Sequence, residues 1–513
     1  MSLGRTPAEE DLFRSTRSAC EARLPESSVF RLLEREAHRL FADEAFADLF
    51  ADVGRRSIAP RIVAVVMVLQ RLHGMSDREA VDAFAFDLRW KYAAGALDFD
   101  HPGFVHTVLV DMRERLRRSE RPNRIFEAVL EVAKQAGLVG RKRVLDSTAL
   151  YDAVATQDTV TMIRSAIVAL LKVADTALAA ELRAVLLRED DYRQSGKPKC
   201  DWDDAPARDA LVDALARDGH ALLAVLHDRR LGADVQQQSE LLATVLGQDL
   251  ETSEDGRFRI VRRVAEDRVV STVDPEARHG HKTASRGFDG YKGHIAIDPD
   301  SEIITATEVT AGNVGDAVPA PALIDDVLGG ASGAEIYGDS SYGTADMVER
   351  IEEIGGEANV KVQPSPSKKG MLAHEAFTID TKQGTVGCPA GQLVQLRPRS
   401  DGSAVALFGQ ACQGCTLRER CTPSKEGRSI QVHPKHDTLH RSRERQRDPA
   451  WKAHYRATRP KVERKIAHLM RRKHGGRRAR MRGRLRISHD FALLAAAVNL
   501  ARLAKLHATA APA

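Results

Sequence analysis

Aromatic residues, cysteines and long apolar runs are all scarce in this chain of 513 residues. The longest apolar runs, 62–69 and 491–498, fall well short of the ~18 residues that a membrane-spanning helix needs. The first residues, MSLGRTPAEEDLF, lack the apolar core of a secretory signal. We therefore expect a cytoplasmic protein that does not bind a membrane. In that reducing compartment its six cysteines should be free or metal-bound, not paired as disulfides.

Negative charge is nearly missing from one region. Between Arg441 and Arg486 there are 19 Lys and Arg but 3 Asp and Glu, whereas the remaining chain has a net charge of −11. A solvated helix face normally mixes both signs, so this run indicates a polyanion partner, most simply nucleic acid. An anionic membrane or a structural charge run is the alternative. Because few aromatic residues interrupt the run, we expect contacts to phosphates and no base stacking.

The hydrophobic content of 43% is typical of a folded protein, and the length suits two to four domains. Residues 1–138 are predicted to form a helical domain, for which binding of DNA ends is one candidate role. Pro60 and Gly74 mark the start and end of one helix, and Ser76 with Glu79 forms the capping box of the next. Two helices joined by so tight a turn form either a helix-turn-helix DNA reader or an ordinary helical hairpin.

Residues 139–507 are predicted to form an α/β domain, because strand and helix patterns alternate there. A helical insertion at 152–256, with a loop at 190–204, interrupts it, and 508–513 is predicted to be a disordered tail. The turn 298–301 should join two strands into a hairpin. The expected strands are 144–146, 291–297, 302–309, 334–337 and 358–362, and the expected helices are 316–328, 345–354 and 490–505.

Three acids are candidate ligands for a hard cation. Asp146 and Asp339 each follow a short apolar strand, and the carboxyl ends of strands are where α/β sheets place their sites. Two carboxylates with substrate phosphates suffice for Mg²⁺. Glu463 is the sole acid between Asp448 and Asp490, in a segment that should be helical with Pro460 in its first turn. Each also has a plainer interpretation: a turn or cap residue for the aspartates, and an ion-pair partner for Glu463.

Four cysteines form a second candidate site, the cysteine cluster. Their spacing, C-x23-C-x2-C-x5-C, predicts a structural Zn²⁺ with four thiolate ligands inside an insert at 385–425, against the alternative of four unrelated thiols. The cluster consists of Cys388, Cys412, Cys415 and Cys421. The isolated Cys20 and Cys200 are expected to be ordinary thiols.

Two further residues near the candidate acids have structural interpretations. His294 is expected to be a hydrogen-bonded strand histidine, and Asp316 to cap its helix.

Five segments occur in an order that resembles the bacterial insertion-sequence transposases of the DDE type, in the branch with a cysteine-rich insert before the catalytic glutamate. The likeness extends over residues 46–506. The segments are VLDSTAL around Asp146, FDGYKGHIAID, VTAGNVGD, YGDSSYG around Asp339, and YRATRPKVERKIAHL around Glu463.

The resemblance implies an RNase H-like mixed sheet that uses Mg²⁺ or Mn²⁺, with Asp146, Asp339 and Glu463 as catalytic residues. It further implies cleavage and strand transfer on double-stranded DNA (terminal inverted repeats and target) by a nucleoid-associated homo-oligomer. A nuclease without strand transfer and a non-catalytic DNA-binding descendant are the alternatives. The expected DNA contacts are Arg459, Arg471, Arg472, Lys473, Arg477, Arg478 and Arg480.

One departure from the family pattern concerns the glutamate helix. Relatives often carry Tyr-x2-Arg-x3-Glu-x6-Lys, whereas here Tyr455 is one residue too far from Arg459 and Met470 occupies the lysine position. We expect Arg471 or Lys473 to replace that lysine in contacting DNA.

Overall fold

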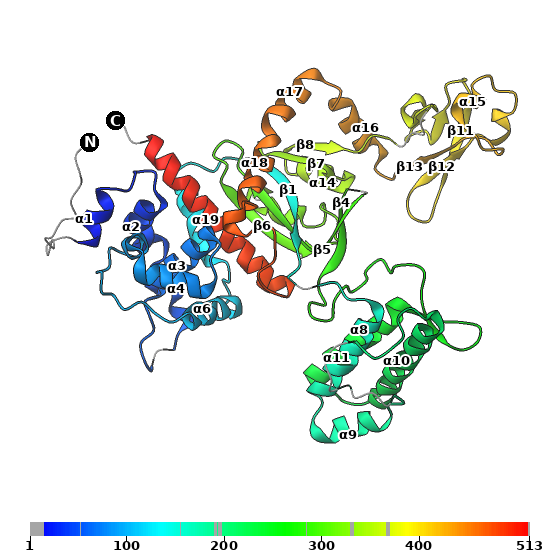
Figure 1. Ribbon diagram of the computed structural model, residues 1–513. Helices are drawn as coiled ribbons and strands as arrows, with labels where there is room; N and C mark the ends of the chain where they lie inside the picture. The colour runs from blue at the N-terminus through cyan, green and yellow to red at the C-terminus, as the bar shows by residue number, and fades with distance from the viewer. Residues whose placement is uncertain are drawn as a thin grey trace, which may run out of the picture.

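The structure is a computed structural model, and it describes residues 15–510 except 52, 154, 189–191, 193–196, 284, 329–332 and 366–369. A mixed sheet occupies the centre, and a group of amino-terminal helices lies beside it (Figure 1). A separate helical bundle and a small β-rich part extend from the sheet at two different places. The chain thus has one main body and two inserted parts.

The central sheet is built around β1, which pairs with β5 in an antiparallel and with β7 in a parallel arrangement. Beyond β7 lies β8, again parallel. The edge of β5 away from β1 pairs with two strands. The first half of β5 pairs with β4 and the second half pairs with β6, and both pairings are antiparallel. The strands are β1 (Lys142–Tyr151), β4 (Arg278–Thr283), β5 (Arg286–Ile297), β6 (Ile304–Ala311), β7 (Glu335–Gly343) and β8 (Glu357–Val362).

The predicted hairpin is present between β5 and β6. Its turn is closed by the Asp298 carboxylate, which accepts hydrogen bonds at 2.9 Å from the backbone amides of both Asp300 and Ser301. An aspartate that bonds to amides two and three residues ahead is the usual way in which such turns are fixed.

The helix predicted over 316–328 is found only in part, because it starts at Ala320 and is interrupted at Ile324. Two single turns stand there instead, α12 (Ala320–Leu323) and α13 (Asp325–Leu328). Pro319 and Pro321 lack the amide hydrogens that a longer helix would need. Asp316 lies four residues before α12, so it does not cap a helix, and its carboxylate has other partners described below. The helix predicted over 345–354 is confirmed as α14 (Ala345–Glu353).

The amino-terminal helices follow the predicted signals. Helix α3 begins at Pro60 and ends at His73, because Gly74 takes the left-handed conformation (φ +67°) that stops the helix. The capping box of Ser76 and Glu79 is formed at the start of α4. The elements are α1 (Thr16–Glu21), α2 (Val29–Leu40), η1 (Asp43–Leu49), α3 (Pro60–His73), α4 (Asp77–Phe86), α5 (Leu88–Ala93), α6 (Thr107–Arg118) and α7 (Arg124–Gln135).

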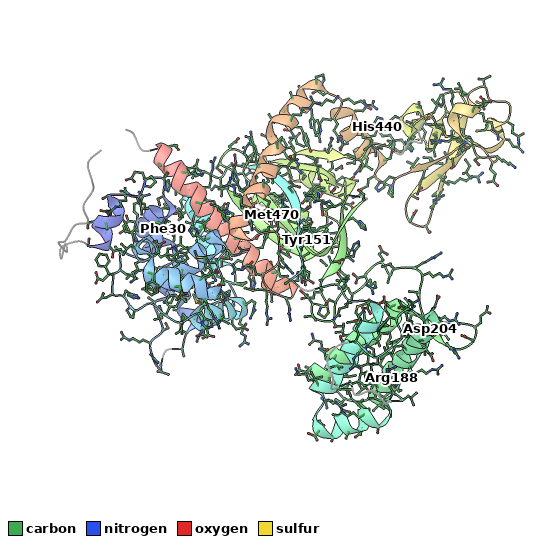
Figure 2. All side chains as sticks on the ribbon, in the orientation of Figure 1. Phe30, Tyr151, Arg188, Asp204, His440 and Met470 are labelled. Atoms are coloured by element: carbon green, nitrogen blue, oxygen red, sulfur yellow. The ribbon has the colours of Figure 1, made fainter. Side chains whose placement is uncertain are left out.

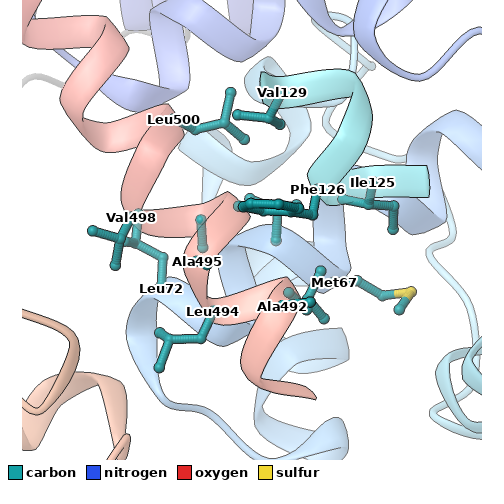
Figure 3. Packing of buried hydrophobic residues seen from close by; sticks show 14 of the residues in the cluster. Met67, Leu72, Ile125, Phe126, Val129, Ala492, Leu494, Ala495, Val498 and Leu500 are labelled. Carbon is teal, nitrogen blue, oxygen red and sulfur yellow. The ribbon is translucent and has the colours of Figure 1, made fainter. Parts of the chain in front are cut away.

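The last helix, α19 (Arg484–Ala510), joins these helices to the sheet. It packs against α3 and α7 on one side and against β6 on the other, so a single hydrophobic core runs through both regions. Figure 3 shows this packing, with Phe126 of α7 against α19. Asn499, fully buried, exchanges two hydrogen bonds with the backbone of Ile304 in β6 (2.9 and 2.8 Å).

Two expectations concern this helix. Residues 508–510 belong to α19 and not to a disordered tail, and 511–513 lie outside the described residues. By length and composition alone the stretch 484–509 is apolar enough to cross a membrane, yet 67% of its most apolar window is buried inside the protein. That burial is expected of a core helix, which α19 is.

The inserted helical bundle has a core of its own, formed by apolar side chains from α8, α10 and α11. The loop expected at 190–204 is irregular over its described part from 197 to 204. The bundle comprises α8 (Thr159–Val173), α9 (Thr176–Ala184), α10 (Ala205–Leu226) and α11 (Ala233–Asp249), followed by the hairpin β2 (Leu250–Thr252) and β3 (Phe258–Ile260).

The part that holds the cysteines is larger than the predicted 385–425. It is a five-stranded antiparallel sheet with a small separate core that includes Phe377, Phe408 and Cys421. Its elements are η2 (His374–Ala376), β9 (Thr378–Asp380), β10 (Thr385–Gly387), β11 (Leu393–Pro398), β12 (Ala404–Leu407), η3 (Gly409–Cys412), α15 (Arg418–Cys421) and β13 (Ser429–Val432). The chain returns to the main sheet through α16 (His436–Arg445), α17 (Pro449–Thr458), α18 (Pro460–Leu469) and η4 (Arg472–His474).

Candidate functional site

Two of the candidate acids lie at the same level of neighbouring strands. Pairing between β1 and β7 ends with Val144 opposite Tyr337, and Asp146 and Asp339 each stand two residues further on. Side chains two residues apart share a face of the sheet, so both acids lie on the face of Val144 and Tyr337. The prediction that both acids stand at strand ends is wrong, because Asp146 lies inside β1 and Asp339 inside β7. Asp339 stands at the point where β7 loses its register with β8.

The third candidate, Glu463, comes from α18, and one arginine contacts all three acids. Nη2 of Arg459 lies 3.0 Å from Oδ1 of Asp146 and 3.8 Å from Oδ2 of Asp339. Its Nη1 lies 3.5 Å from Oε1 of Glu463, one helical turn away. The two aspartate oxygens therefore cannot be further apart than the sum of the first two distances. We call Asp146, Asp339, Glu463 and Arg459 the acid cluster.

Exposure differs across the acid cluster. The Arg459 side chain is 7% exposed and that of Asp146 15%, whereas Asp339 is 42% and Glu463 64% exposed. Arg459 was expected to contact DNA, but in this structure its guanidinium is enclosed by carboxylates. Tyr455, although displaced from the family spacing, also reaches the cluster, because its hydroxyl donates to the carbonyl of Gly338 at 3.1 Å.

Burial has a clear electrostatic consequence at Asp146. Desolvation raises the pKa of its carboxyl to about 6, even though the neighbouring Arg459 guanidinium and the Ser147 amide both lower it. Burial likewise raises the pKa of Tyr455 to about 12, so that its phenol stays protonated. One guanidinium therefore does not fully balance the carboxylates, and the site favours additional positive charge.

The donors of this cluster fit a hard divalent cation in their chemistry. Three carboxylates from three elements supply the oxygen ligands that Mg²⁺ and Mn²⁺ prefer. Across the described part of the chain, however, no group of three or more His, Cys, Asp or Glu side chains has the arrangement of a metal site. In the acid cluster the reason is visible, since Arg459 lies between the acids.

A second polar group adjoins the acids, and only part of it was expected from the sequence. Lys292 of β5 donates to Oδ1 of Asp316 at 2.9 Å, and Ser147 donates to Oδ2 of the same carboxylate at 2.8 Å. His294, fully buried, has Nε2 2.9 Å from Oγ1 of Thr310, as expected of a hydrogen-bonded strand histidine. Sequence reasoning missed Lys292, although it stands in the block FDGYKGHIAID.

The basic segment, residues 471–480, closes against the end of β1. The backbone amide of Tyr151, labelled in Figure 2, donates to Arg477, and the amide of Ala479 donates to Tyr151. Gly74 faces the carbonyl of Lys473 so closely that an added Cβ would lie 2.4 Å from it. The backbone is thus fixed, while the predicted DNA-contacting side chains of this segment are exposed: Arg471, Arg472, Lys473, Arg477, Arg478 and Arg480.

The charge of α4 bears on the helix-turn-helix alternative. This helix, the second of the pair, contains Asp77, Glu79 and Asp82 but Arg78 as its one basic residue. A helix that enters a DNA groove must pass between two phosphate backbones, which repel carboxylates. The charge pattern therefore favours the ordinary helical hairpin.

The four cysteines of the cysteine cluster line one small cavity of about 20 Å³. A cavity of that size holds a single water molecule or ion. All six cysteines of the chain are free thiols, as expected. The four sulfurs are nevertheless not arranged as metal ligands. Zinc binding therefore stays a prediction, supported by the common cavity.

Comparison with protein families gives two matches. A model described as "Transposase DDE domain" matches residues 387–504, which include the cysteine cluster, the basic segment and Glu463. A second, "Transposase domain (DUF772)", matches residues 18–115 in the amino-terminal helices. Asp146 and Asp339 lie outside both matched ranges. No curated protein and no solved structure matches the chain.

Proposed function

Because the chain belongs to the insertion-sequence transposases of the DDE type, we propose that it cuts DNA at the ends of a mobile element and joins the freed ends to target DNA. Asp146, Asp339 and Glu463 are the proposed catalytic residues. Hydrolysis of a phosphodiester would release a 3′-hydroxyl, which would then attack a phosphodiester of the target strand.

The observation that carries this proposal is the contact of all three acids with the Arg459 guanidinium. Residues 146, 339 and 463 are far apart in the sequence, and cap or surface residues without a common role are not expected to contact the same side chain. A mixed sheet with acids on its central strand and on the neighbouring one also supports an RNase H-like catalytic domain.

In this proposal the three carboxylates hold divalent cations once Arg459 has moved aside. Bound cations would activate the attacking hydroxyl and neutralise charge on the phosphodiester. Asp146, the most buried acid, would fix the innermost position, and the more exposed Asp339 and Glu463 would close it on the solvent side. The displaced Arg459 guanidinium would then be available to a DNA phosphate, as expected from the sequence.

The basic segment is the proposed track for the DNA backbone. It is attached to Tyr151, five residues beyond Asp146 on β1, which is about 17 Å at ~3.3 Å per residue. That distance is about five base pairs at ~3.4 Å each. A duplex that binds the exposed arginines can therefore extend to the acid cluster. Action on DNA in the cytoplasm, in association with the nucleoid, follows from this proposal.

The test separates chemistry from binding. Asp339→Asn keeps the shape of the side chain but removes a ligand charge, so cleavage of DNA carrying the sequences that flank the gene should fall by about 100- to 1,000-fold in Mg²⁺. DNA affinity should stay equal or rise slightly. Asp234→Asn, an exposed acid of the helical bundle, is the matched control. Wild-type rates of cleavage and joining in Asp339→Asn would reject the proposed mechanism.

The complementary variant neutralises Arg477, Arg478 and Arg480 together. Affinity should fall, and the slope of log affinity against log salt should flatten by about one unit per lost phosphate contact. The control removes three exposed cations of the helical bundle, Lys172, Arg208 and Arg217. An unchanged salt slope in the basic-segment variant would show that DNA binds elsewhere.

A further inference from the structure

A polar cavity of about 360 Å³ lies beside the two strand acids. Asp146 and Asp339 line it together with Lys292 and Asp316. A second cavity of about 710 Å³ also has Lys292 in its lining, so this lysine borders both cavities. His281 lines both cavities as well, and its side chain is exposed.

Lys292 is held far more firmly than a surface lysine. Its side chain is 15% exposed, and its ammonium group donates to the carbonyl of Val314 at 2.8 Å and to Asp316 at 2.9 Å. An ammonium group has three N–H donors. Within the described residues these two contacts leave one donor unassigned, on a group that lines both cavities.

Asp316 connects this ammonium group to the catalytic strand. Its other oxygen accepts from the Ser147 hydroxyl at 2.8 Å, and the Ser147 amide donates to Asp146 at 2.9 Å. The Asp316 side chain is 14% exposed, so the pair with Lys292 is largely desolvated. Desolvating an ion pair is costly, and a purely structural contact is served as well by apolar side chains. Because the Lys292–Asp316 pair lies beside Asp146 and Asp339, we look for a role in substrate binding and not only in the fold.

We propose that Lys292 binds a phosphate oxygen of the DNA strand that occupies this cavity, and that Asp316 is a positioning residue which holds Lys292 in place. The inference rests on the proposed function and adds a substrate contact in the cavity that Asp146 and Asp339 line. A phosphate that approaches two carboxylates needs a compensating cation, and Lys292 supplies one that is already fixed. Asp316 keeps the lysine directed into the cavity and tied to β1.

The experiment pairs protein variants with DNA in which single phosphates are replaced by uncharged methylphosphonates. The DNA is a duplex with the terminal sequence that flanks the gene, and both affinity in Ca²⁺ and the cleavage rate in Mg²⁺ are measured. Lys292→Met should lower the cleavage rate by about 10- to 100-fold, the effect of losing one charged hydrogen bond. Lys292→Arg should restore part of it.

The informative readout is non-additivity. If Lys292 binds one particular phosphate, the methylphosphonate there should weaken binding by the wild type and not by Lys292→Met, while other substitutions weaken both equally. Asp316→Asn should weaken this coupling without abolishing it. The double variant Lys292→Met with Asp316→Asn leaves no unpaired buried charge, so a loss that persists in it is not a folding defect. Lys361→Met, an exposed lysine of β8, controls for general loss of positive charge.

Equal losses at every phosphate in wild type and Lys292→Met, with wild-type cleavage intact, would overturn this inference and leave the proposed function standing. Absence of cleavage by the wild type would instead reject the proposed function. In that case the binding data alone decide whether Lys292 contacts a phosphate.

Discussion

The acid cluster and the cysteine cluster are assembled over very different lengths of chain. The acids come from residues 146, 339 and 463 and meet only when β1, β7 and α18 are packed together. The cysteines come from residues 388–421 and share a small part with its own core. The acid cluster therefore depends on the main fold, whereas the cysteine cluster depends on local structure.

The two clusters also differ in how their charge is balanced. Arg459 provides the acid cluster with an internal cation, so the carboxylates are stabilised before any ion binds. The cysteine cluster has no such group: burial raises the pKa of the Cys421 thiol, and the nearby Arg428 lowers it only in part. The acid cluster should therefore tolerate metal loss. The small core of seven buried side chains beside the cysteines should depend on an ion if the cysteine cluster binds zinc as predicted.

The largest expected effect is in the cysteine cluster. Cys412→Ser with Cys415→Ser should abolish about one bound zinc per chain and unfold residues 378–432 locally, because structural zinc contributes about 10 kcal/mol or more to the folding of small domains. Elemental analysis and hydrogen exchange measure both, with Cys200→Ser as the control. Hydrogen exchange in β1 and β7 should not change. A metal-free wild type whose thermal stability equals that of the variant would contradict the prediction.

A smaller effect is expected for Arg459→Met. Removing the internal cation leaves the buried Asp146 carboxylate unpaired, which should lower the free energy of unfolding by about 3 kcal/mol at pH 8. Loss of the contacts of Arg459 with the exposed Asp339 and Glu463 should lower the free energy of unfolding by less than about 1 kcal/mol more. Added Mg²⁺ should restore part of the loss if the acids bind it. Urea denaturation tests this against Arg456→Met, an exposed arginine of the preceding helix α17.

The smallest effect is a pH dependence. The pKa of Asp146 is raised to about 6, so its proton competes with a cation below that pH. Affinity for Mn²⁺ should be constant from pH 7 to 8 and fall about tenfold per unit below pH 6. Because the pKa is raised, ionisation of Asp146 destabilises the metal-free protein, and Arg459→Met should therefore lose less stability at pH 5 than at pH 8. A Mn²⁺ affinity that is flat down to pH 5 would show that Asp146 is not a ligand.

Signals that act within a few residues were read correctly from the sequence. The ends of α3 at Pro60 and Gly74, the capping box of Ser76 and the turn at Asp298 all rest on hydrogen bonds between near neighbours. Asp316 shows where such reasoning stops. Its partners, Ser147 and Lys292, are 169 and 24 residues away, and nothing in the local pattern distinguishes them from a helix amide.

The acid cluster could be predicted only in part for the same reason. The apolar runs before Asp146 and Asp339 indicate strands, but not that β1 and β7 continue past these acids. The enclosure of Arg459 depends on how α18 packs on β1. Likewise, the sequence divided the chain into an amino-terminal domain and a catalytic domain, while the structure has one core through both. The apolar residues of α19 do not show, in the sequence, that this helix packs against both the amino-terminal helices and β6.

That shared helix determines when the protein can fold during its synthesis. The amino-terminal helices leave the ribosome first, yet the faces of α3 and α7 that pack on α19 stay uncovered until residues near position 500 have been made. At ~5–20 residues per second, about 18 to 73 seconds pass between the end of α7 and position 500. During that time the amino-terminal helices expose apolar surface and the sheet lacks a cover for β6. Any product truncated before α19 would lack every core side chain that this helix contributes. The acid cluster also needs Glu463 of α18, so the nascent chain cannot complete it before it is nearly full length.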